Sequence, residues 1–249
     1  PYPVADATFE PLVTLATQLN IPIHCHVHET RAEVDESRRL HGLTPLARLK
    51  RLGLLGPGFI GVHCVHLADD DLELLAATGC SVAHCPTSNL KLASGIAPVA
   101  RMRQLGINVG LGTDGAASNN RLDMFGEMRL AALLAKGSSG DATTLPAREA
   151  LRMATLDGAT ALGLGNEIGS ITPGKAADLV AVNLKGLNTK PCYDPLSHLV
   201  YVADRECVTH VWIAGKCCVD HKRVVGNGGN DLESAIALWQ NRLEVRREP

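Results

Sequence analysis

The sequence predicts an α/β fold, and two observations lead to that prediction. Amphipathic stretches that end at Gly or Asn alternate four times with short apolar or β-branched runs within the first 115 of the 249 residues. A parallel neighbouring strand requires a crossover of about a dozen residues or more, and the amphipathic stretches supply crossovers of that length. The first part of the chain is therefore expected to consist of parallel strands joined by helices.

Each expected strand follows its helix directly and leads to a polar residue. The expected helices cover residues 10–19, 45–52, 69–77 and 98–105, and the expected strands cover residues 21–26, 59–63, 80–84 and 107–112. The polar residues at the strand ends are His26, His63, His84 and Asp114. Parallel α/β folds assemble their chemistry at the carboxyl ends of the strands. Four such ends converge on one point only in a closed or strongly curved sheet, which favours a (β/α)8 TIM-type barrel.

A complete barrel contains eight strand-helix units, whereas four are recognisable in this sequence. Residues 1–165 are therefore expected to form about the second, C-terminal half of a barrel. Half a barrel leaves two open strand edges, which natural folds avoid. Two interpretations follow: another ~150 to 200 residues precede Pro1, or a separate segment associates with this chain. A homo-oligomer stays open as well.

The composition of the chain changes after the barrel half. Two further helices are expected over residues 121–136 and 146–162, and short strands over 178–182, 208–214 and 217–219. Gly215-Lys216 is the expected hairpin tip between the last two strands. These strands predict a small β unit over residues 166–226. A flexible link and a charged terminal helix are expected over residues 227–249.

Composition and charge exclude several classes of protein. A formal net charge of −2 leaves no broad cationic face for phosphate backbones, so no nucleic-acid partner is expected. No apolar run approaches the ~18 to 20 residues that a membrane span needs, and no signal peptide opens the chain. We therefore expect no membrane partner and a cytoplasmic protein. The eight cysteines, without a secretory signal, are expected to be reduced.

Most of the ten histidines lie between His24 and His84, and their spacing suggests a metal site. His24, His26 and His28 alternate along one expected strand, which places them on one face while the segment stays extended. Inward-facing imidazoles need hydrogen-bond partners or a metal, so either hydrogen-bonded core histidines or metal ligands account for them. The scattered histidines at 41, 198, 210 and 221 are interpreted as structural or exposed.

Asp114 adds a carboxylate at a later strand end, within the run Leu-Gly-Thr-Asp-Gly. An Asp in such a turn can serve as a capping residue alone. Imidazole plus carboxylate is also a ligand set suited to a catalytic divalent ion such as zinc. His26 and Asp114 are the candidate ligands, and His63 is either a third ligand or a proton-handling residue.

Four ordered motifs resemble the amidohydrolase superfamily. They are His-Val-His-Glu-Thr from position 26, Val-His-Cys-Val-His-Leu from 62, Ala-His-Cys-Pro-Thr-Ser-Asn-Leu-Lys-Leu from 83 and Leu-Gly-Thr-Asp-Gly-Ala-Ala-Ser-Asn-Asn from 111. Within the superfamily the sequence is most similar to the 5-methylthioadenosine/S-adenosylhomocysteine deaminases and their chlorohydrolase-like relatives. The run from Gly174 to Val180 looks like part of the small β-sandwich that flanks these barrels.

The resemblance implies one zinc ion held by a His-x-His pair on the first barrel strand, a His on the fifth and an Asp on the eighth. By similarity His26 and Asp114 are the last two of these ligands. The first-strand pair has no counterpart in this sequence, so two further His ligands are expected from a segment before Pro1. Glu29 matches the proton shuttle, and His63 matches the histidine that orients the attacking hydroxide. Glu29, His84 and Asp114 are the candidate substrate-binding residues.

The resemblance implies a hydrolytic deaminase acting on an adenine nucleoside, namely 5′-methylthioadenosine, S-adenosylhomocysteine or adenosine, to give the inosine analogue and ammonia. Two alternatives stay open. The same metal site could hydrolyse another heterocycle, such as guanine, cytosine or an s-triazine. The chain could also be a catalytically inactive barrel that serves as a scaffold. His66 fits a pocket-lining role as well as a structural one. The Ser and Asn residues that follow His84 and Asp114 are expected to shape loops.

Overall fold

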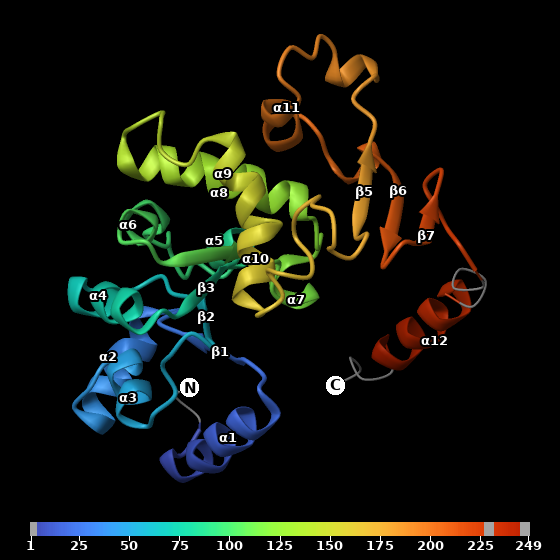
Figure 1. Cartoon of the computed structure of the whole chain (residues 1–249). Helices are drawn as coiled ribbons and strands as arrows, with labels where there is room; N and C mark the ends of the chain where they lie inside the picture. Colours follow the sequence, from blue (N-terminus) through green and yellow to red (C-terminus); the bar gives the residue numbers. More distant parts are fainter. Residues whose placement is uncertain (1–3, 227–231, 245–249) are drawn as a thin grey trace. The chain divides into compact units, whose positions relative to one another are not determined.

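The computed structural model describes residues 4–226 and 232–244, which divide into two compact units (Figure 1). The first unit runs to Lys175 and also includes Leu184–Arg205, and the second comprises Ala176–Asn183 and the chain from Glu206 onward. Residues 166–175 and 184–205 therefore group with the first unit, whereas we expected them in the small β unit. The expected link and the ends of the terminal helix, at 227–231 and 245–249, lie outside the described residues.

The first unit is built on a sheet of four parallel strands in the order β1-β2-β3-β4. The strands are β1 Ile23–Val27, β2 Phe59–His63, β3 Ser81–His84 and β4 Asn108–Leu111. Val27 is paired with His63 across β1 and β2, and His84 with Leu111 across β3 and β4. This register aligns the carboxyl ends of all four strands at one edge. All four predicted strands are confirmed within two residues at each end.

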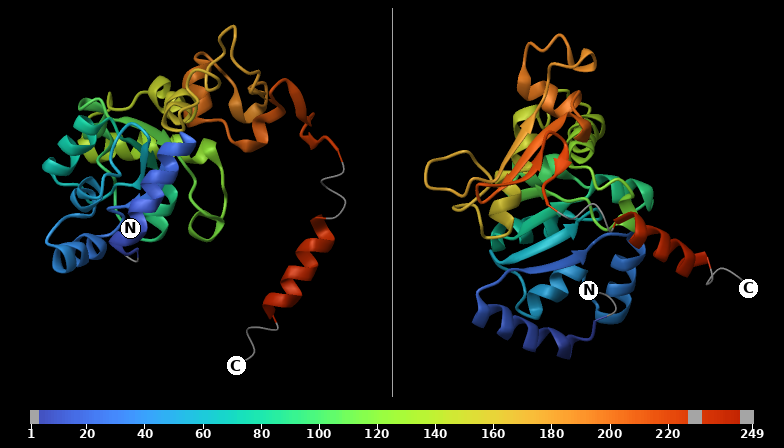
Figure 2. Two further views of the ribbon diagram at one scale, coloured as in Figure 1. Left: turned by 60° about the horizontal axis from the view of Figure 1, so that its bottom comes forward. Right: turned by 90° about the vertical axis from the view of Figure 1, so that its right-hand side faces the viewer.

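Helices follow every strand of this sheet and pack beside it (Figures 1 and 2). The helices of the first unit are α1 Asp6–Leu19, α2 Arg31–His41, α3 Pro45–Arg51, α4 Asp69–Thr78, α5 Pro86–Lys91, α6 Val99–Gln104, α7 Ala116–Asn119, α8 Met124–Ser139, α9 Ala147–Met153, α10 Leu156–Ala161 and α11 Pro195–Tyr201, with a 3-10 turn at Leu187–Thr189. A second 3-10 turn, Arg205–Cys207, begins at the last residue of this unit and continues into the second unit. The sequence analysis did not predict α2, α5 or α7. These three helices lie in the connections that follow the strand ends.

The backbone conformation at the helix ends confirms two predicted ends and corrects two predicted helix ranges. Asn20 and Gly79 close α1 and α4 in the left-handed conformation, as expected. The helix expected over residues 121–136 begins and ends later, because α8 starts at Met124, continues through Gly137 and ends at Gly140, whose φ is 69°. The helix expected over 146–162 is two helices, because Thr155 leaves the helical region at φ −130° and ψ −95°.

The core of the first unit lies between the sheet and its helices. Val27, Val82 and Val109 on three different strands are fully buried, as are Leu49 on α3 and Met102 on α6. Burial of each such side chain stabilises the fold by about 1.5–3 kcal/mol. Parallel strands with helices packed against them are expected to be this apolar.

Close packing of α10 on β4 depends on two glycines. A Cβ added at Gly110 would lie 2.9 Å from the Cα of Gly158, which is closer than real Cβ contacts allow. We expect Gly110→Ala to lower the free energy of unfolding by about 1–3 kcal/mol, because the helix must move away from the strand. Denaturant unfolding of the purified protein measures this change.

Gly137→Ala is the matched control for that substitution. Gly137 lies inside α8, and a Cβ at this position meets nothing within 4 Å. Alanine is favoured over glycine inside a helix by about 0.5–1 kcal/mol, so this variant is expected to be more stable than the wild type. Equal stability of the two variants would contradict the proposed crowding at Gly110.

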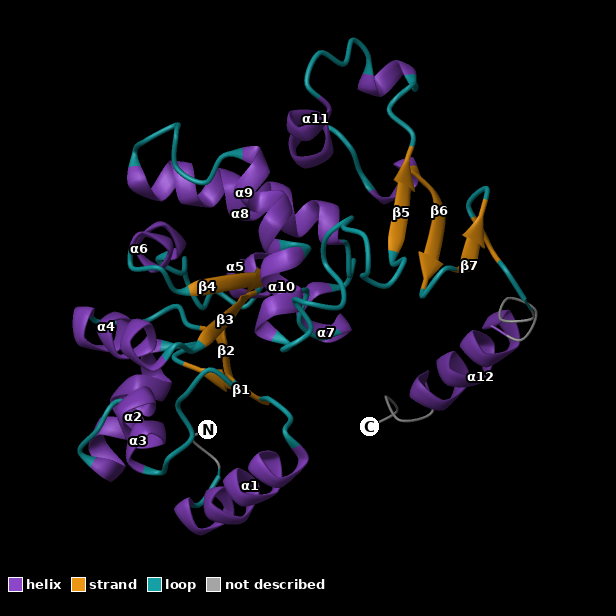
Figure 3. Ribbon diagram, viewed as in Figure 1, coloured by secondary structure: helices purple, strands orange, loops and turns teal. Residues whose placement is uncertain are grey.

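The second unit contains one antiparallel sheet with the order β5-β6-β7-β8 (Figure 3). Its elements are β5 Leu179–Val182, β6 Val208–Ile213, β7 Lys216–Asp220, β8 Arg223–Val224 and the helix α12 Leu232–Glu244. Ala214 and Gly215 form the tip between β6 and β7 with φ values of 48° and 78°. The tip therefore lies one residue earlier than expected, because two consecutive positive φ values suit the twist of a two-residue hairpin.

The eight cysteines all have free thiols. Burial raises the pKa of the Cys85 thiol to about 12. A thiol that holds its proton at neutral pH is a poor nucleophile and a poor metal ligand, so Cys85 is a packing residue. Within residues 4–226 and 232–244, no helix has the length and apolar character of a bilayer span.

Candidate active site

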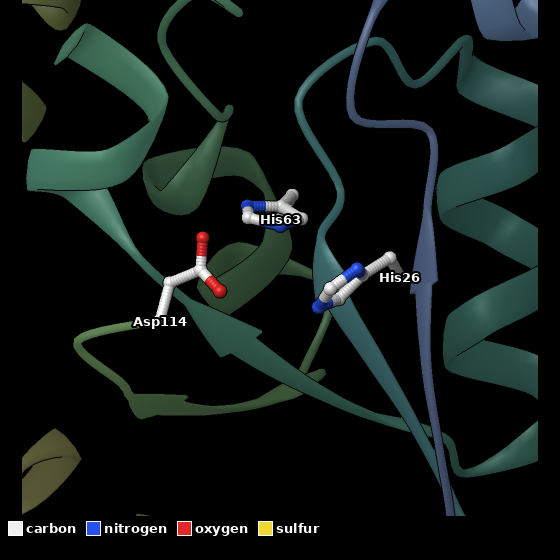
Figure 4. A group of neighbouring side chains, drawn as sticks. All are labelled: His26, His63 and Asp114. Atoms are coloured by element: carbon white, nitrogen blue, oxygen red, sulfur yellow. The ribbon is translucent and has the colours of Figure 1, made fainter. Parts of the chain in front are cut away.

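The carboxyl ends of three strands bring His26, His63 and Asp114 together (Figure 4). His26 lies on β1, His63 is the last residue of β2, and Asp114 lies in the loop after β4. One potential ligand atom from each residue lies within 4.8 Å of the other two. The two imidazole rings are 5.0 Å apart between centroids. Parallel pairing with aligned strand ends produces this convergence, as the sequence analysis expected.

The backbone turns sharply where the strands deliver these side chains. His28, His63 and Asp114 have φ values of 55°, 72° and 60°, in the left-handed region that β-rich segments avoid. Such conformations cost on the order of 1 kcal/mol or more each and persist only where surrounding structure holds them. The Cys64 N–H donates to the Val27 carbonyl at 3.1 Å, which holds the turn after β2. Strained residues concentrate at functional sites, and these three lie at one edge of the sheet.

Asp114 is held as an anion by hydroxyl groups. Ser88 on α5 and Ser118 on α7 both donate to Oδ2 of Asp114, at 2.7 and 2.6 Å. Burial alone would raise the pKa of Asp114, but these two hydrogen bonds, with a backbone N–H and the nearby His63, lower it to about 2. Both serines contact Oδ2, so neither of them occupies Oδ1, the oxygen that would bind a cation.

His63 is oriented by a buried amide. The Asn89 Oδ1 lies 2.8 Å from Nδ1 of His63, and both side chains are buried. An amide oxygen accepts only, so the neutral ring carries its proton on Nδ1 and a lone pair on Nε2. That Nε2 lies 3.8 Å from Oε2 of Glu29. His63 therefore presents its free nitrogen to the candidate site, between Glu29 and the Asp114 loop.

The loop that carries Glu29 is fixed by a buried carboxylate. Glu33 on α2 is 6% exposed and accepts hydrogen bonds from the backbone N–H groups of His28 and Glu29, at 3.2 and 2.7 Å. Thr30 caps the same helix by accepting from the Glu33 N–H at 3.2 Å. Glu29 itself receives a hydrogen bond from Ser94 at 3.4 Å. The helix start thus positions the Glu29 side chain beside His63.

A second buried carboxylate holds the Asp114 loop, and the sequence analysis missed it. Glu127 on α8 is 2% exposed and accepts from the Thr87 N–H at 3.1 Å and from Asn119 at 2.7 Å. Asn119 also donates to the Thr113 carbonyl at 2.8 Å. Glu127 thereby ties α5 to the loop before α7. A lone Glu in an amphipathic helix carries no sequence signal for this role.

Two of the clustered histidines are structural. Nδ1 of His28 lies 2.7 Å from the His66 carbonyl, and its Nε2 accepts from the Leu46 N–H at 3.2 Å. The expectation that His24, His26 and His28 share one face was wrong for His28, because its left-handed φ turns its ring out of the strand pattern. His66 is bonded to the Ser94 carbonyl at 2.7 Å.

His84, at the end of β3, is 2% exposed, and its Nδ1 has no hydrogen-bond partner among the described residues. Burial, with a smaller contribution from the nearby His63, lowers the pKa of His84 to about 4. An unfolded histidine binds its proton near pH 6.5, so between pH 6.5 and about 4 the unfolded state binds more protons. We expect the unfolding free energy to fall by about 1.4 kcal/mol per pH unit as the pH drops through this window.

Denaturant unfolding at a series of pH values measures this effect, with His84→Gln as the comparison. The variant lacks the titrating ring, so its stability should vary less steeply with pH than that of the wild type. Parallel pH profiles for the two proteins would show that His84 does not bury a neutral imidazole.

The donor set fits a divalent metal ion. Two imidazoles and an anionic carboxylate are ligands that zinc and related late first-row cations prefer. His26 is exposed, so its ring nitrogens are accessible to an ion. Within the described residues, one other group has three such donors, in the second unit. The strand ends of the first unit therefore form a candidate metal centre with Glu29 beside it.

Comparison with known proteins gives consistent matches. The sequence profile of the amidohydrolase family matches residues 1–218. The chain is 43% identical over 250 residues to a 5-methylthioadenosine/S-adenosylhomocysteine deaminase from Teredinibacter turnerae, an alignment covering 99% of this chain and 56% of that protein. The chain spans about half the length of the curated relatives that it matches.

Two solved structures extend the comparison. An adenosine deaminase from Xanthomonas campestris with bound zinc has a TM-score of 0.95 and 48% identity, over 97% of this chain and 55% of that one. An atrazine chlorohydrolase from Arthrobacter aurescens, complexed with zinc, has a TM-score of 0.87 and 29% identity, over 95% of this chain and 52% of that one. The strand-end chemistry, the parallel sheet and the profile agree, and the chain belongs to the amidohydrolase family, with its TIM-barrel type of fold.

Proposed function

We propose that this chain carries the carboxyl-terminal part of a zinc-dependent hydrolytic deaminase of adenine nucleosides. The substrates are 5′-methylthioadenosine, S-adenosylhomocysteine or adenosine, and the products are the inosine analogue and ammonia. The observation that supports this most directly is the convergence of His26, His63 and Asp114, with Glu29 3.8 Å from His63. The names of the similar proteins point to the same reaction.

We also propose that the parallel sheet is about half of a (β/α)8 barrel. In this proposal the other strands, and two further His ligands, come from outside these 249 residues. The free edges of β1 and β4 within the described sheet support it, as does the greater length of the relatives. The antiparallel sheet of the second unit is proposed to be part of the flanking β-sandwich.

His26 and Asp114 are the proposed zinc ligands within this chain. When bound, zinc acts as a Lewis acid and lowers the pKa of a coordinated water to about 7. The lowered pKa of Asp114 keeps this residue anionic at every pH at which the reaction is expected to run. Ser88 and Ser118 fix the direction of the carboxylate through hydrogen bonds. Hydrogen bonds to a metal ligand typically contribute about 10–100-fold to metal affinity. We expect a contribution of this size from each serine.

The other residues handle protons around the attacked carbon of the heterocycle. Asp114 accepts a proton from the attacking water. Glu29 donates its proton to the ring nitrogen beside that carbon, takes up the remaining proton of the added hydroxyl group and passes it to the amine, so that the carbon–nitrogen bond breaks and ammonia leaves. The proton held by Asp114 then returns to Glu29 and restores both carboxyl groups. His63, held by Asn89, hydrogen-bonds the attacking oxygen and the oxyanion that develops. Nδ1 of His84 is proposed to face the substrate ring.

An ammonia-release assay tests the proposed function directly. The zinc-loaded protein that carries this chain is incubated with each of the three nucleosides, and the ultraviolet change from adenine to hypoxanthine is followed in parallel. Removal of zinc by chelation should abolish turnover, and added zinc should restore it. A protein that contains well under one zinc per chain and releases no ammonia would instead be an inactive scaffold.

A second candidate reaction is hydrolysis of another heterocycle. The structural similarity to a zinc-containing atrazine chlorohydrolase at 29% identity favours this alternative. A panel containing guanine, cytosine and a chlorinated s-triazine, with detection of both ammonia and chloride, separates the two. Chloride release without nucleoside deamination would favour the triazine reaction over the proposed one.

A further inference from the structure

The second unit contains another group of side chains with metal-binding atoms. His210 lies on β6, Asp220 ends β7, and His221 begins the turn to β8. One potential ligand atom from each lies within 4.8 Å of the other two. None of these residues belongs to the candidate active site, and the sequence analysis treated both histidines as structural or exposed.

The backbone of the sheet brings these three residues together. His221 and Lys222 have φ values of 45° and 68°, which turn the chain tightly between β7 and β8. The Lys222 N–H donates to the Thr209 carbonyl at 2.9 Å, so the turn folds back onto β6. Asp220 and His221 are thus placed beside His210 by main-chain hydrogen bonding. The group is consequently present before any ligand binds.

Hydrogen bonding determines which nitrogen of His210 is free. The Thr209 hydroxyl donates to the Ala181 carbonyl at 3.2 Å, so its oxygen accepts from Nδ1 of His210 at 3.0 Å. A neutral His210 therefore has its lone pair on Nε2. This Nε2 lies 3.1 Å from Oδ1 of Asp220, which also bears lone pairs. The lone pairs of His210 Nε2 and Asp220 Oδ1 repel one another at that distance unless a proton or a metal cation is bound between the two atoms.

We propose that His210, Asp220 and His221 bind a divalent cation of the zinc class. Nδ1 of His221 lies 2.7 Å from the same Oδ1 of Asp220, so two imidazole nitrogens converge on one carboxylate oxygen. Donor atoms in a tetrahedral zinc sphere are about 3.3 Å apart, given bonds of about 2.0 Å. The observed separations of 2.7 and 3.1 Å need only a small outward movement of the two exposed side chains to reach that value.

Two of the three side chains at this site are exposed, and the third stacks on an aromatic ring. The Asp220 and His221 side chains are 57% and 83% exposed, so water can complete the coordination. The His210 ring stacks on Trp212, with planes 6° apart and centroids separated by 5.4 Å. The Thr209 bond and this stacking hold the ring orientation, as partners of metal-bound histidines commonly do. A bound ion would join β6 to the β7–β8 turn.

Tryptophan fluorescence tests the site, because Trp212 stacks directly on a proposed ligand. Within these 249 residues the other tryptophan is Trp239, so the Trp212 signal is taken as the difference between the Trp239→Phe protein and the same protein with Trp212→Phe added. Ni2+ is the probe, since it is paramagnetic and, unlike Cu2+, does not oxidise the eight free cysteines. At mildly alkaline pH we expect saturable quenching by Ni2+ that Zn2+ reverses. Quenching that fails to saturate would overturn the proposal, because it would be collisional and would show that no ion binds at the group.

Variants locate the bound ion. His221→Ala and Asp220→Asn should each weaken Ni2+ binding by about 10-fold or more, since loss of a ligand costs at least as much as loss of its outer partner. Lys222→Asn is the matched control in the same turn and should bind as the parent does. Asp114→Asn in the first unit should also leave the quenching unchanged. Equal affinity in the two ligand variants and the parent, or loss of quenching in Asp114→Asn, would overturn the assignment.

Discussion

Glu29→Gln is expected to lower kcat for nucleoside deamination by about 10²–10⁴-fold, the usual contribution of a positioned general acid or base. Glutamine has nearly the same shape but cannot give up or take a proton in this reaction. KM should change much less than kcat, because the substitution removes proton transfer and leaves the pocket in place. Steady-state kinetics with the ammonia assay measures both constants.

The fold should tolerate this change. The Glu29 carboxylate is 26% exposed and contacts Ser94 and His63 only at 3.4 and 3.8 Å, while Glu33 holds the local backbone. Glu36→Gln on α2 is the matched control, because the Glu36 side chain is 44% exposed and pairs with Arg39 on the same helix. Wild-type kcat in Glu29→Gln would remove Glu29 from the proposed mechanism.

Asp114→Asn is expected to have the larger effect, because it removes the anionic ligand. A neutral amide replaces a carboxylate that is ionised above pH 2, and its NH₂ group conflicts with the hydroxyl donors of Ser88 and Ser118 if it faces them. We expect zinc affinity to fall by more than about 100-fold, the upper end of what loss of an outer hydrogen bond costs. Deaminase activity should fall with it.

Elemental analysis after dialysis measures retained zinc, and the ammonia assay measures activity in the same samples. Asp141→Asn is a suitable control, because Asp141 is an exposed turn residue whose carboxylate bonds only Thr143 in the structure. The control should keep both zinc and activity. If Asp114→Asn keeps one zinc per chain and full activity, His26 and Asp114 do not share a metal ion.

Sequence periodicity predicted the strands of the parallel sheet well and the helices around the sheet less well. The four strands were expected at nearly their observed positions, because short apolar runs bounded by Gly or Asn leave few alternatives. The short helices α5 and α7 were missed, since six and four residues are too few to show a helical period. The helix expected over residues 121–136 was ended before Gly137, although helix packing tolerates the cost of a glycine inside a helix, about 1 kcal/mol.

Residue type and order selected His26, His63 and Asp114 as candidate site residues, and the family resemblance added Glu29. Each lies at or just after the end of a recognisable strand, and the carboxyl ends of parallel strands share one edge whatever the loops do. The substitutions above test the roles proposed for these residues. Their partners could not be found in the same way, because hydrogen bonds such as that between Asn89 and His63 join positions far apart in the chain.

The sequence by itself determined the α/β alternation, the strand ends at which the candidate site lies and the family, because these depend on local patterns of apolar, glycine and polar residues. Only the tertiary structure decided that His28 is a packing residue, that Glu127 and Asn89 hold the site, and that His210 meets Asp220 and His221. Those outcomes depend on left-handed turns and on side-chain contacts between distant segments. Both arise from packing of the whole chain, which no local pattern encodes.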